Sequence, residues 1–518
     1  MALSYLPVDR DQLFLVPPSM RDWLPEGHLV WFVLDVVGRI DTSALHARHP
    51  NNGVGRRAYD PDMLLALLVY AYCTGQRSSR AIERHCESDV AYRVICANHA
   101  PDHTTIARFR QHHQAIAVSM FTDVLVLCAN VGLANVGVVA VDGTKMGADA
   151  SLKANRTRSQ IEAEVTSMLA EAAAADEVAD RLFGDDRGDE LPAELADPRT
   201  RGSRLDAALR QLEAQEAGRR AAEAAARAAR AKAEAEAAAK GQAARGRKPK
   251  SADPVGDAEA DLEAALSAEA QGMTEWRRQQ DAARAAGGAN PSRPGTSRSQ
   301  RARRRLEHIL ANPPPPPPKP EPVRANTTDP ESRIMKTAKG WVQGYNAQAA
   351  VNDQGITLAA TVTQDHNDVD QCIPMMAATQ ANLVAAGVSD PIGTMLFDAG
   401  YCAKDNLSAV GPDRLIATAK SWKLRRAAKT EGFAIGDPPP DATPAQAMEH
   451  RLRTEAGAAL YGLRQSTVEP LFGDIKANRG FWGFMRRGLA PNDAEWKLIC
   501  STNNIIKMFR VGTALPAT

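Results

Sequence analysis

Apolar and polar positions alternate at helical spacing along the N-terminal part of the chain. Residues 60–75 (DPDMLLALLVYAYCTG) begin with acidic capping residues, continue as a strongly apolar run and close on a glycine. Residues 78–96 start with two serines, and residues 100–128 contain Asp102 as a further helix-start signal. The pattern predicts an all-α N-terminal domain over residues 1–130.

Two apolar runs farther along the chain end on aspartates. Residues 136–151 (VGVVAVDGTKMGADAS) run into Asp142, and residues 392–401 (IGTMLFDAGY) run into Asp398. Each run predicts a buried strand, and an acid at the end of a strand is held rigidly, where a metal ion could bind it. For Asp142 a simpler alternative is that it begins a tight hairpin turn, because Asp-Gly is the commonest signal for such a turn.

The elements after these strands predict the rest of the fold. Residues 340–353 and 355–365 predict a hairpin, residues 368–387 a helix, residues 414–420 a short strand and residues 464–480 a helix. In the last helix, Pro470 is tolerable only in the first turns, because proline lacks a backbone N–H. With the two strands above, this order predicts an α/β fold in which helices flank a sheet.

A long stretch of different composition interrupts this region. Residues 156–325 are rich in Ala, Glu and Arg and poor in aromatic and branched residues, which is typical of long helices or coiled coil. Gly-, Pro- and Arg-rich breaks and a polyproline spacer (NPPPPPPKPEP) divide it. We expect a helical, partly disordered insertion whose role is dimerisation, DNA contact or neither, and which splits the α/β domain into residues 131–155 and 326–512.

Bulk composition excludes several classes of protein. A formal net charge of +1 excludes a globally basic nucleic-acid coat, and seven cysteines without a CxxC pair indicate reduced thiols in place of a disulfide scaffold or zinc site. Residues 124–141 carry no charge, but a helix ending near Asn130 and a strand beginning near Val136 explain them better than a membrane span. We therefore expect a soluble cytoplasmic protein, associated with the nucleoid, that does not bind membranes.

Basic residues gather locally instead. Residues 414–429 contain six basic residues and no acid, and residues 476–510 contain seven basic residues against two acids. The second run also carries Phe481, Trp482 and Phe484, a mixture suited to phosphates and unstacked bases. Arg108 and Arg110 near a helix start are compatible with helix-turn-helix DNA recognition and equally with an ordinary helical bundle.

A third acid completes a catalytic pattern. Glu469 lies in the helix predicted over residues 464–480, facing the strands that carry Asp142 and Asp398. Carboxylates on two strand ends and a facing helix are what two-metal phosphoryl transfer requires, because hard cations prefer oxygen ligands.

The order of these motifs resembles the DDE transposases of bacterial insertion sequences. The resemblance rests on VDGTK (141–145), DPESRIMK (329–336), GYNAQAAV (344–351), FDAGY (397–401) and VEPLFGDIK (468–476), and on residues 59–113, which resemble a helical N-terminal domain of one branch of the family. It covers about residues 10–155 and 326–510. It implies an RNase H-like mixed sheet flanked by helices as the catalytic core, preceded by the all-α domain.

The resemblance also implies site residues and ligands. Asp142, Asp398 and Glu469 are the expected metal-binding catalytic triad, with Mg²⁺ as the cofactor and Mn²⁺ as a substitute. The family signature on the glutamate helix corresponds to Tyr461, Arg464, Glu469 and Lys476, although Arg464 lies one residue farther from the glutamate than usual. The expected DNA-binding residues are Tyr461, Arg464, Lys476, Arg479, Trp482, Arg486, Arg487, Arg108 and Arg110. The expected partners are double-stranded DNA, as terminal inverted repeats and target DNA, and a second copy of the chain in a homodimeric active complex.

Two alternatives remain open from the sequence. An RNase H-like nuclease that hydrolyses DNA without joining it would use the same triad. A non-catalytic DNA-binding protein derived from a transposase would not need intact acids.

Asp365, Asn367 and Asp368 are expected to cap the helix that follows them.

Overall fold

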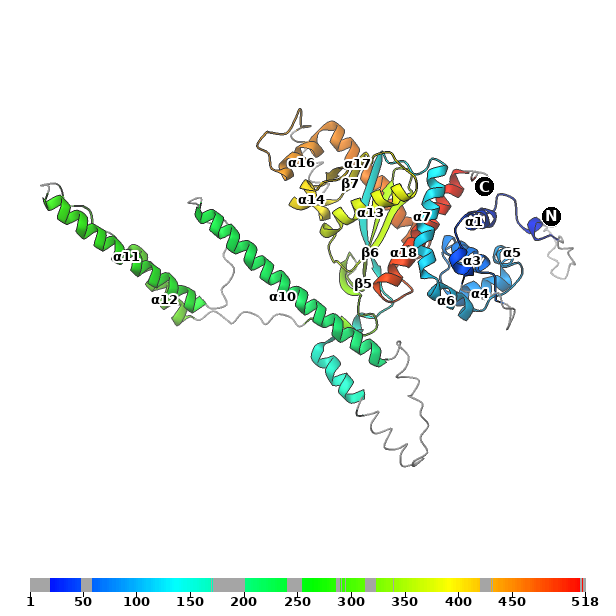
Figure 1. Cartoon of the computed structure of the whole chain (residues 1–518), viewed down its shortest axis with the longest axis horizontal. Helices are drawn as coiled ribbons and strands as arrows, with labels where there is room; N and C mark the ends of the chain where they lie inside the picture. Colours follow the sequence, from blue (N-terminus) through cyan, green and yellow to red (C-terminus); the bar gives the residue numbers. More distant parts are fainter. Residues whose placement is uncertain are drawn as a thin grey trace, which may run out of the picture. The chain divides into compact units, whose positions relative to one another are not determined.

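The computed structural model describes residues 19–47, 58–168, 201–239, 254–285, 291–293, 295–312, 323–338, 340–419 and 432–512, and a few single positions outside these ranges. The chain forms two compact units (Figure 1). One comprises Met1–Glu213 with Arg324–Thr518, and the other comprises Ala214–Val323. The polyproline spacer lies outside the described residues.

The N-terminal part of the first unit is helical, as predicted. Its elements are η1 (Met20–Trp23), α1 (Leu29–Val37), α2 (Ser43–His46), α3 (Pro61–Cys73), α4 (Ser79–Ser88), α5 (Val90–Ile95), α6 (His103–His112) and α7 (Gln114–Asn130). Asp60 and Asp102 cap α3 and α6 by accepting backbone N–H groups of the first turn. Helix α3 is apolar on all sides, and eleven of its thirteen residues are therefore buried.

The uncharged stretch at residues 124–141 divides as predicted, into the end of α7 at Asn130 and a strand that begins at Val138. Among the described residues, no single helix has the length and apolar composition to cross a membrane. Helices α6 and α7 together have both, but they bend by 71° at their junction. All seven cysteines are free thiols, in agreement with the reading of their spacing.

A mixed sheet forms the centre of the first unit and confirms the predicted α/β class. Its strands are β1 (Val138–Gly147), β4 (Arg333–Thr337), β5 (Gly340–Asn352), β6 (Thr357–Thr363), β7 (Thr394–Phe397) and β8 (Asp413–Ile416). Strand β1 lies between β5, which is antiparallel to it, and β7, which is parallel to it. Strand β8 continues the parallel side, and β4 and β6 both pair with β5 on the antiparallel side.

Helices pack against this sheet from several parts of the chain. The C-terminal elements are η3 (Val369–Gln371), α13 (Cys372–Ala385), η4 (Ala399–Tyr401), α14 (Lys404–Ser408), α16 (Pro444–Arg453), α17 (Glu455–Gly473), the π-helical turn η5 (Asp474–Asn478) and α18 (Leu489–Val511). Helix α17 packs on β1, β5 and β7, and α18 packs on β6 as well as on α3 and α7. Helix α18 thereby joins the sheet to the N-terminal helices, with Trp496 fully buried and donating its indole N–H to the carbonyl of Gln348 at 2.8 Å.

Two expectations about these elements are wrong. Strand β1 does not end at Asp142 and the Asp-Gly pair makes no turn, because β5 continues beside β1 and pairs with it as far as Gly147. Pro470 lies near the C-terminal end of α17 and not in its first turns, because the helix begins at Glu455, after the cap residue Thr454. The π-helical turn η5 follows at once, and proline, which removes a helical hydrogen bond, is a known site of such irregularity.

The two ends of the insertion lie side by side. Strand β2 (Asn155–Thr157) pairs antiparallel with β3 (Arg324–Asn326). Between them lie the long helices α10 (Arg201–Ala239) and α11 (Pro254–Ala285), as predicted, and the shorter α12 (Ser297–Ala311). The basic stretch read from sequence as a low-complexity break therefore includes a helix.

Candidate active site

The sheet brings Asp142 and Asp398 together. Strands β1 and β7 run parallel with Val141 opposite Phe397, and each aspartate is the next residue along its own strand. Strand β7 ends at Phe397. Asp398 is the N-cap of η4, and its side chain accepts the backbone N–H of Gly400 at 2.8 Å. The two carboxylates, 256 positions apart in the numbering of the chain, therefore share the edge where the parallel pairing ends.

Helix α17 brings Arg464 and Glu469 to the same edge. A terminal nitrogen of Arg464, Nη1, donates to Oδ2 of Asp142 at 3.0 Å, and Nη2 lies 4.0 Å from Oε1 of Glu469. Glu469 is half exposed and also accepts the side-chain amide of Gln465 at 3.1 Å. The guanidinium of Arg464 thus lies between two acids of the expected triad, despite its unusual spacing from the glutamate.

Burial dominates the electrostatics of the two aspartates. It raises the pKa of Asp142 to about 6, an effect that the positive charge of Arg464 opposes and the nearby Asp398 increases. Burial also raises the pKa of Asp398, against the backbone hydrogen bond from Gly400 and the charge of Arg464. Because burial is the largest cause of both shifts, a bound cation that neutralises the two carboxylates would offset the cost of burying their charge.

The donors fit a hard divalent cation by chemistry, because all of them are carboxylate oxygens. Among the described residues, however, no three His, Cys, Asp or Glu side chains are grouped closely enough to hold a metal ion. The guanidinium of Arg464 lies between the carboxylates of Asp142 and Glu469.

The raised pKa of Asp142 predicts a pH-dependent stability in the absence of divalent ions. Because the folded-state pKa is about 6 against an ordinary 3.8, the contribution of Asp142 to stability is fully present below pH 4 and is lost as the pH rises through 6. The loss should be about 3 kcal/mol. Urea unfolding in a chelator at pH 4 to 8 measures it, and Asp142→Asn should lack this component. An identical pH profile in both proteins would contradict the assignment.

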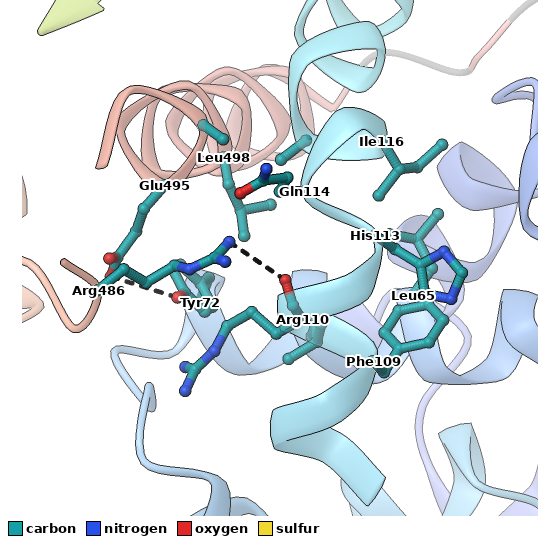
Figure 2. A pocket seen from close by; sticks show the side chains of 13 residues that line it. Leu65, Tyr72, Phe109, Arg110, His113, Gln114, Ile116, Arg486, Glu495 and Leu498 are labelled. Carbon is teal, nitrogen blue, oxygen red and sulfur yellow. Dashed lines mark hydrogen bonds between the residues drawn. The ribbon is translucent and has the colours of Figure 1, made fainter. Parts of the chain in front are cut away.

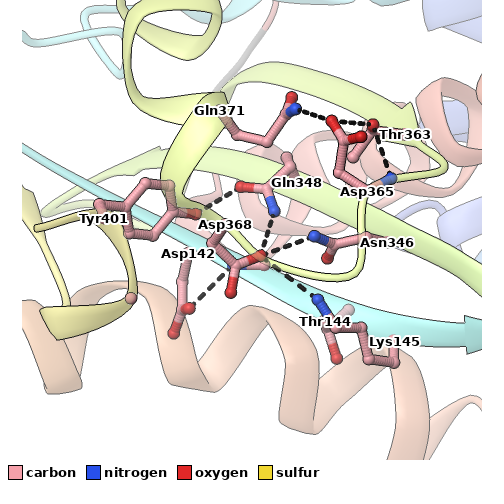
Figure 3. Close-up of polar contacts among 12 residues, drawn as sticks. Asp142, Thr144, Lys145, Asn346, Gln348, Thr363, Asp365, Asp368, Gln371 and Tyr401 are labelled. Atoms are coloured by element: carbon pink, nitrogen blue, oxygen red, sulfur yellow. Dashed lines mark hydrogen bonds and ion pairs between the residues drawn. The ribbon is translucent and has the colours of Figure 1, made fainter. Parts of the chain in front are cut away.

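Asp368 is a fourth acid at this edge, and its expected role as a cap is wrong. It precedes η3 but makes no capping hydrogen bond with its side chain. Its Oδ1 instead accepts the side-chain amides of Asn346 at 2.6 Å and Gln348 at 2.8 Å, and Nζ of Lys145 at 3.4 Å (Figure 3). Tyr401 extends the network by donating its hydroxyl to Oε1 of Gln348. Asp365 is not a cap either, since it accepts side-chain groups of Thr363 and Gln371.

Gly143 makes room for this network. A Cβ at Gly143 would lie 2.2 Å from Nε2 of Gln348, 2.5 Å from Oδ1 of Asp368 and 2.9 Å from Oδ1 of Asn346. The Asp-Gly pair therefore needs its glycine for a close approach of side chains and not for a turn. The sequence does carry a signal for this network, because Asn346 and Gln348 are polar at alternate positions of the mostly apolar stretch GYNAQAAV and so face one side of the sheet.

Lys476 lies in the π-helical turn and contacts the continuation of β1. Its Nζ donates to Oγ1 of Thr144 at 2.6 Å and to the carbonyl of Lys145 at 3.0 Å, and it lies 5.9 Å from the centre of the Trp482 ring. Burial lowers the pKa of Lys476. Trp482 itself is 58% exposed, in a loop that Gly483 ties to Gly147 at the end of β1. The lysine thus supports the strand while the tryptophan is presented to solvent.

The other predicted DNA-binding arginines fall into two groups. Arg108 and Arg487 are exposed, and Arg487 pairs with Asp149 at 3.0 Å. Arg479 is buried against Asp474, while Arg110 donates to the carbonyl of Arg77 and Arg486 donates to the carbonyl of Arg110. In the second group each guanidinium contacts at least one protein group. Of the basic run at 414–429, Arg414 is buried, while Lys420, Lys423, Arg425, Arg426 and Lys429 lie outside the described residues.

A buried polar cluster, which the sequence did not reveal, joins the N-terminal helices to the loop beside β1. Glu495 of α18 is 3% exposed and accepts Nη1 of Arg77 at 3.3 Å, the hydroxyl of Tyr72 at 3.4 Å and the backbone N–H of Met485 at 2.9 Å. A pocket beside it is lined mainly by apolar side chains of α3, α6, α7 and α18 (Figure 2). None of the four acids at the sheet edge lines this pocket, so it is separate from the candidate active site.

Two family models match the chain. One, described as a transposase domain (DUF772), matches residues 18–112, and the other, described as a transposase DDE domain, matches residues 440–509. The second match contains Arg464, Glu469 and Lys476, whereas Asp142 and Asp398 lie outside both matches. Searches of curated proteins and of solved structures found no match. The chain thus carries a transposase domain near its N-terminus and a transposase DDE domain near its C-terminus, which is consistent with a DDE-type transposase of an insertion sequence.

Proposed function

We propose that this transposase cleaves DNA at the ends of an insertion sequence and transfers the freed strand into target DNA in a metal-dependent reaction. Transposase function in general, and hence DNA binding, follow from the two family matches. The observation that carries the finer proposal is the meeting of Asp142 and Asp398 at one sheet edge, with Arg464 and Glu469 brought to it by α17.

The proposed catalytic core is RNase H-like, with residues 131–155 and 326–512 forming one domain. The mixed sheet supports this, because β1 separates an antiparallel side from a parallel side and helices α13 and α17 pack on the sheet. Residues 1–130 are proposed to recognise the element ends, with exposed Arg108 on α6 available to a phosphate.

Asp142, Asp398 and Glu469 are the residues that would hold a divalent cation, Mg²⁺ or Mn²⁺. When bound, such an ion supplies Lewis acidity at a phosphate and lowers the pKa of a water nucleophile. The protein's own side chains orient the DNA. Arg464 presents a planar guanidinium beside the acids, a geometry suited to phosphate oxygens, and Trp482 presents an exposed ring on which an unpaired base can stack.

The proposed partners are terminal inverted repeats, target DNA and a second copy of the chain in the active complex. Because the substrate is genomic DNA, we propose that the protein works in the cytoplasm, at the nucleoid.

One assay separates this function from its rivals. Purified protein is incubated with DNA bearing the element ends, a supercoiled target plasmid and Mg²⁺, and the products are resolved on a gel. We expect cleaved ends and joined plasmid, and a chelator should remove both products. Cleaved ends without joined plasmid would favour the nuclease, and neither product together with retained DNA binding would favour the non-catalytic alternative.

A further inference from the structure

The pairing of β1 with β7 stops just before the two aspartates of the candidate site. Its last pair is Val141 opposite Phe397, so Asp142 and Asp398 are the first residues beyond it. Strand β1 continues past Asp142 and stays paired with β5 as far as Gly147, whereas Asp398 leaves the sheet as the N-cap of η4. The position of the Asp398 carboxylate relative to that of Asp142 therefore depends on what holds η4 in place.

The turns η3 and η4 are joined by a buried side chain. Asn406 is 5% exposed, and its Nδ2 donates to the carbonyl of Val369 in η3 at 2.6 Å and to the carbonyl of Tyr401 in η4 at 2.8 Å. Asp368 directly precedes η3, and Asp398 directly precedes η4. The segments that carry these two acids are therefore connected to each other through Asn406.

Asp368 connects these turns to the central strands. Its Oδ1 accepts three side-chain donors, which come from Lys145 on β1 and from Asn346 and Gln348 on β5 (Figure 3). Lys145 lies opposite Asn346 in the β1–β5 ladder, and side chains alternate along a strand, so all three donors lie on one face of the sheet. Asp142 lies on the other face, where a side chain of α17 contacts it. Asp368 thus supports the candidate site from the face of the sheet opposite α17.

The carboxylate of Asp368 also lies near that of Asp398. A Cβ at Gly400 would be 2.9 Å from Oδ1 of Asp398 and 3.6 Å from Oδ2 of Asp368. Tyr401, the next residue, is fully buried and donates its hydroxyl to Oε1 of Gln348, whose Nε2 donates to Oδ1 of Asp368 at 2.8 Å. Gln348 therefore links η4 to Asp368, and both are anchored on β5.

We propose that Asp368 is a positioning residue for the metal site: held by β1 and β5, its carboxylate keeps η4, and with it the carboxylate of Asp398, in place beside Asp142. The inference rests on the proposed function, in which Asp142 and Asp398 hold the cation. Asp368 acts through its neighbours, because its Oδ1 already accepts three donors on the face of the sheet opposite α17, the helix that carries Glu469. Removing a group that orients metal ligands typically lowers metal affinity by about 10- to 100-fold.

Binding of Mn²⁺ to the full-length protein tests this role without any reaction on DNA. The electron paramagnetic resonance signal of free Mn²⁺ gives the Kd. Asp368→Ala should raise the Kd by about 10- to 100-fold, and Asp368→Asn should raise it less, because the amide oxygen still accepts Asn346 and Gln348. Tyr401→Phe removes no carboxylate but breaks the link from η4 to Gln348, so it should also raise the Kd, by about tenfold. Circular dichroism checks that each variant is folded, and if Asp368→Ala is not, the other two variants decide the outcome.

Asp365→Ala is the matched control for the loss of a carboxylate from this segment. Asp365 lies three residues before Asp368, and its carboxylate accepts side-chain groups of Thr363 and Gln371. This variant should bind Mn²⁺ with the wild-type Kd. Equal losses in Asp365→Ala and Asp368→Ala would show that only the order of the segment matters, and would overturn the proposal. Wild-type affinity in Tyr401→Phe would overturn it as well, because a positioning role requires the link through Gln348.

A variant of the proposed metal site separates this inference from the proposed function. Asp142→Ala should bind Mn²⁺ more weakly than the wild type. If Asp142→Ala has wild-type affinity, the proposed metal site is wrong and the positioning role of Asp368 falls with it. If Asp142→Ala loses affinity and Asp368→Ala does not, the positioning role alone is wrong.

Discussion

Replacing Asp142, Asp398 or Glu469 with alanine should abolish both cleavage and joining while binding to the element ends remains detectable. Asp142 and Asp398 meet at the sheet edge, α17 brings Glu469 to it, and all three acids lie outside the N-terminal helices. Removing a group that stabilises the transition state electrostatically costs about a thousandfold in rate. Strand-transfer assays measure the loss, and a gel-shift assay measures end binding.

Asp390→Ala provides the matched control, because Asp390 is an exposed aspartate in the segment that leads into β7. It should cleave and join at the wild-type rate. If any one of the three alanine variants joined DNA at a rate near that of the wild type, that residue would be removed from the proposed metal site.

Replacing Glu495 with alanine should cause the largest loss of stability. The change would leave the guanidinium of Arg77, the hydroxyl of Tyr72 and the N–H of Met485 without their shared acceptor in a buried cluster. Breaking a buried charged pair by removing one partner costs about 3–5 kcal/mol. Chemical denaturation of the full chain measures this, with Glu495→Gln expected to lose less because the amide keeps one acceptor oxygen.

Glu449→Ala is the matched control, because Glu449 is exposed on α16. A loss below about 1 kcal/mol for Glu495→Ala, comparable to a surface substitution, would show that the cluster does not hold the N-terminal helices to the sheet.

The sequence predicts those parts of the fold that depend on nearby residues. Asp60 and Asp102 predict the starts of α3 and α6, because a capping side chain binds backbone N–H groups in the first turn of the helix that follows it. The apolar runs before Asp142 and Asp398 predict strands for the same local reason. The end of β1 could not be predicted in this way, because it depends on how far β5 runs beside it, and β5 begins almost two hundred positions later in the numbering.

In the candidate site, too, features that depend on nearby residues are predictable from the sequence and those that depend on distant elements are not. The order of motifs predicts the triad acids, but the direction of a side chain depends on partners from distant elements. Asp368 looked like a cap because it precedes a helix, whereas Asn346 and Gln348 from another strand determine where its carboxylate lies. Arg110 and Arg486 are predicted DNA contacts because they are basic, and the hydrogen bonds that they donate to backbone carbonyls could not be predicted from the sequence.

The pairing of β2 with β3 brings the two ends of the insertion together. Thr157 and Arg324 are neighbours across this small ladder, at the roughly 5 Å separation of paired strands. The large sheet therefore does not depend on the length of what lies between them, since each further doubling of such a loop costs only about 0.6 kcal/mol. This junction is a natural point for exchange of modules: a foreign domain whose two ends lie close together could be grafted here without altering the register that brings Asp142 to Asp398.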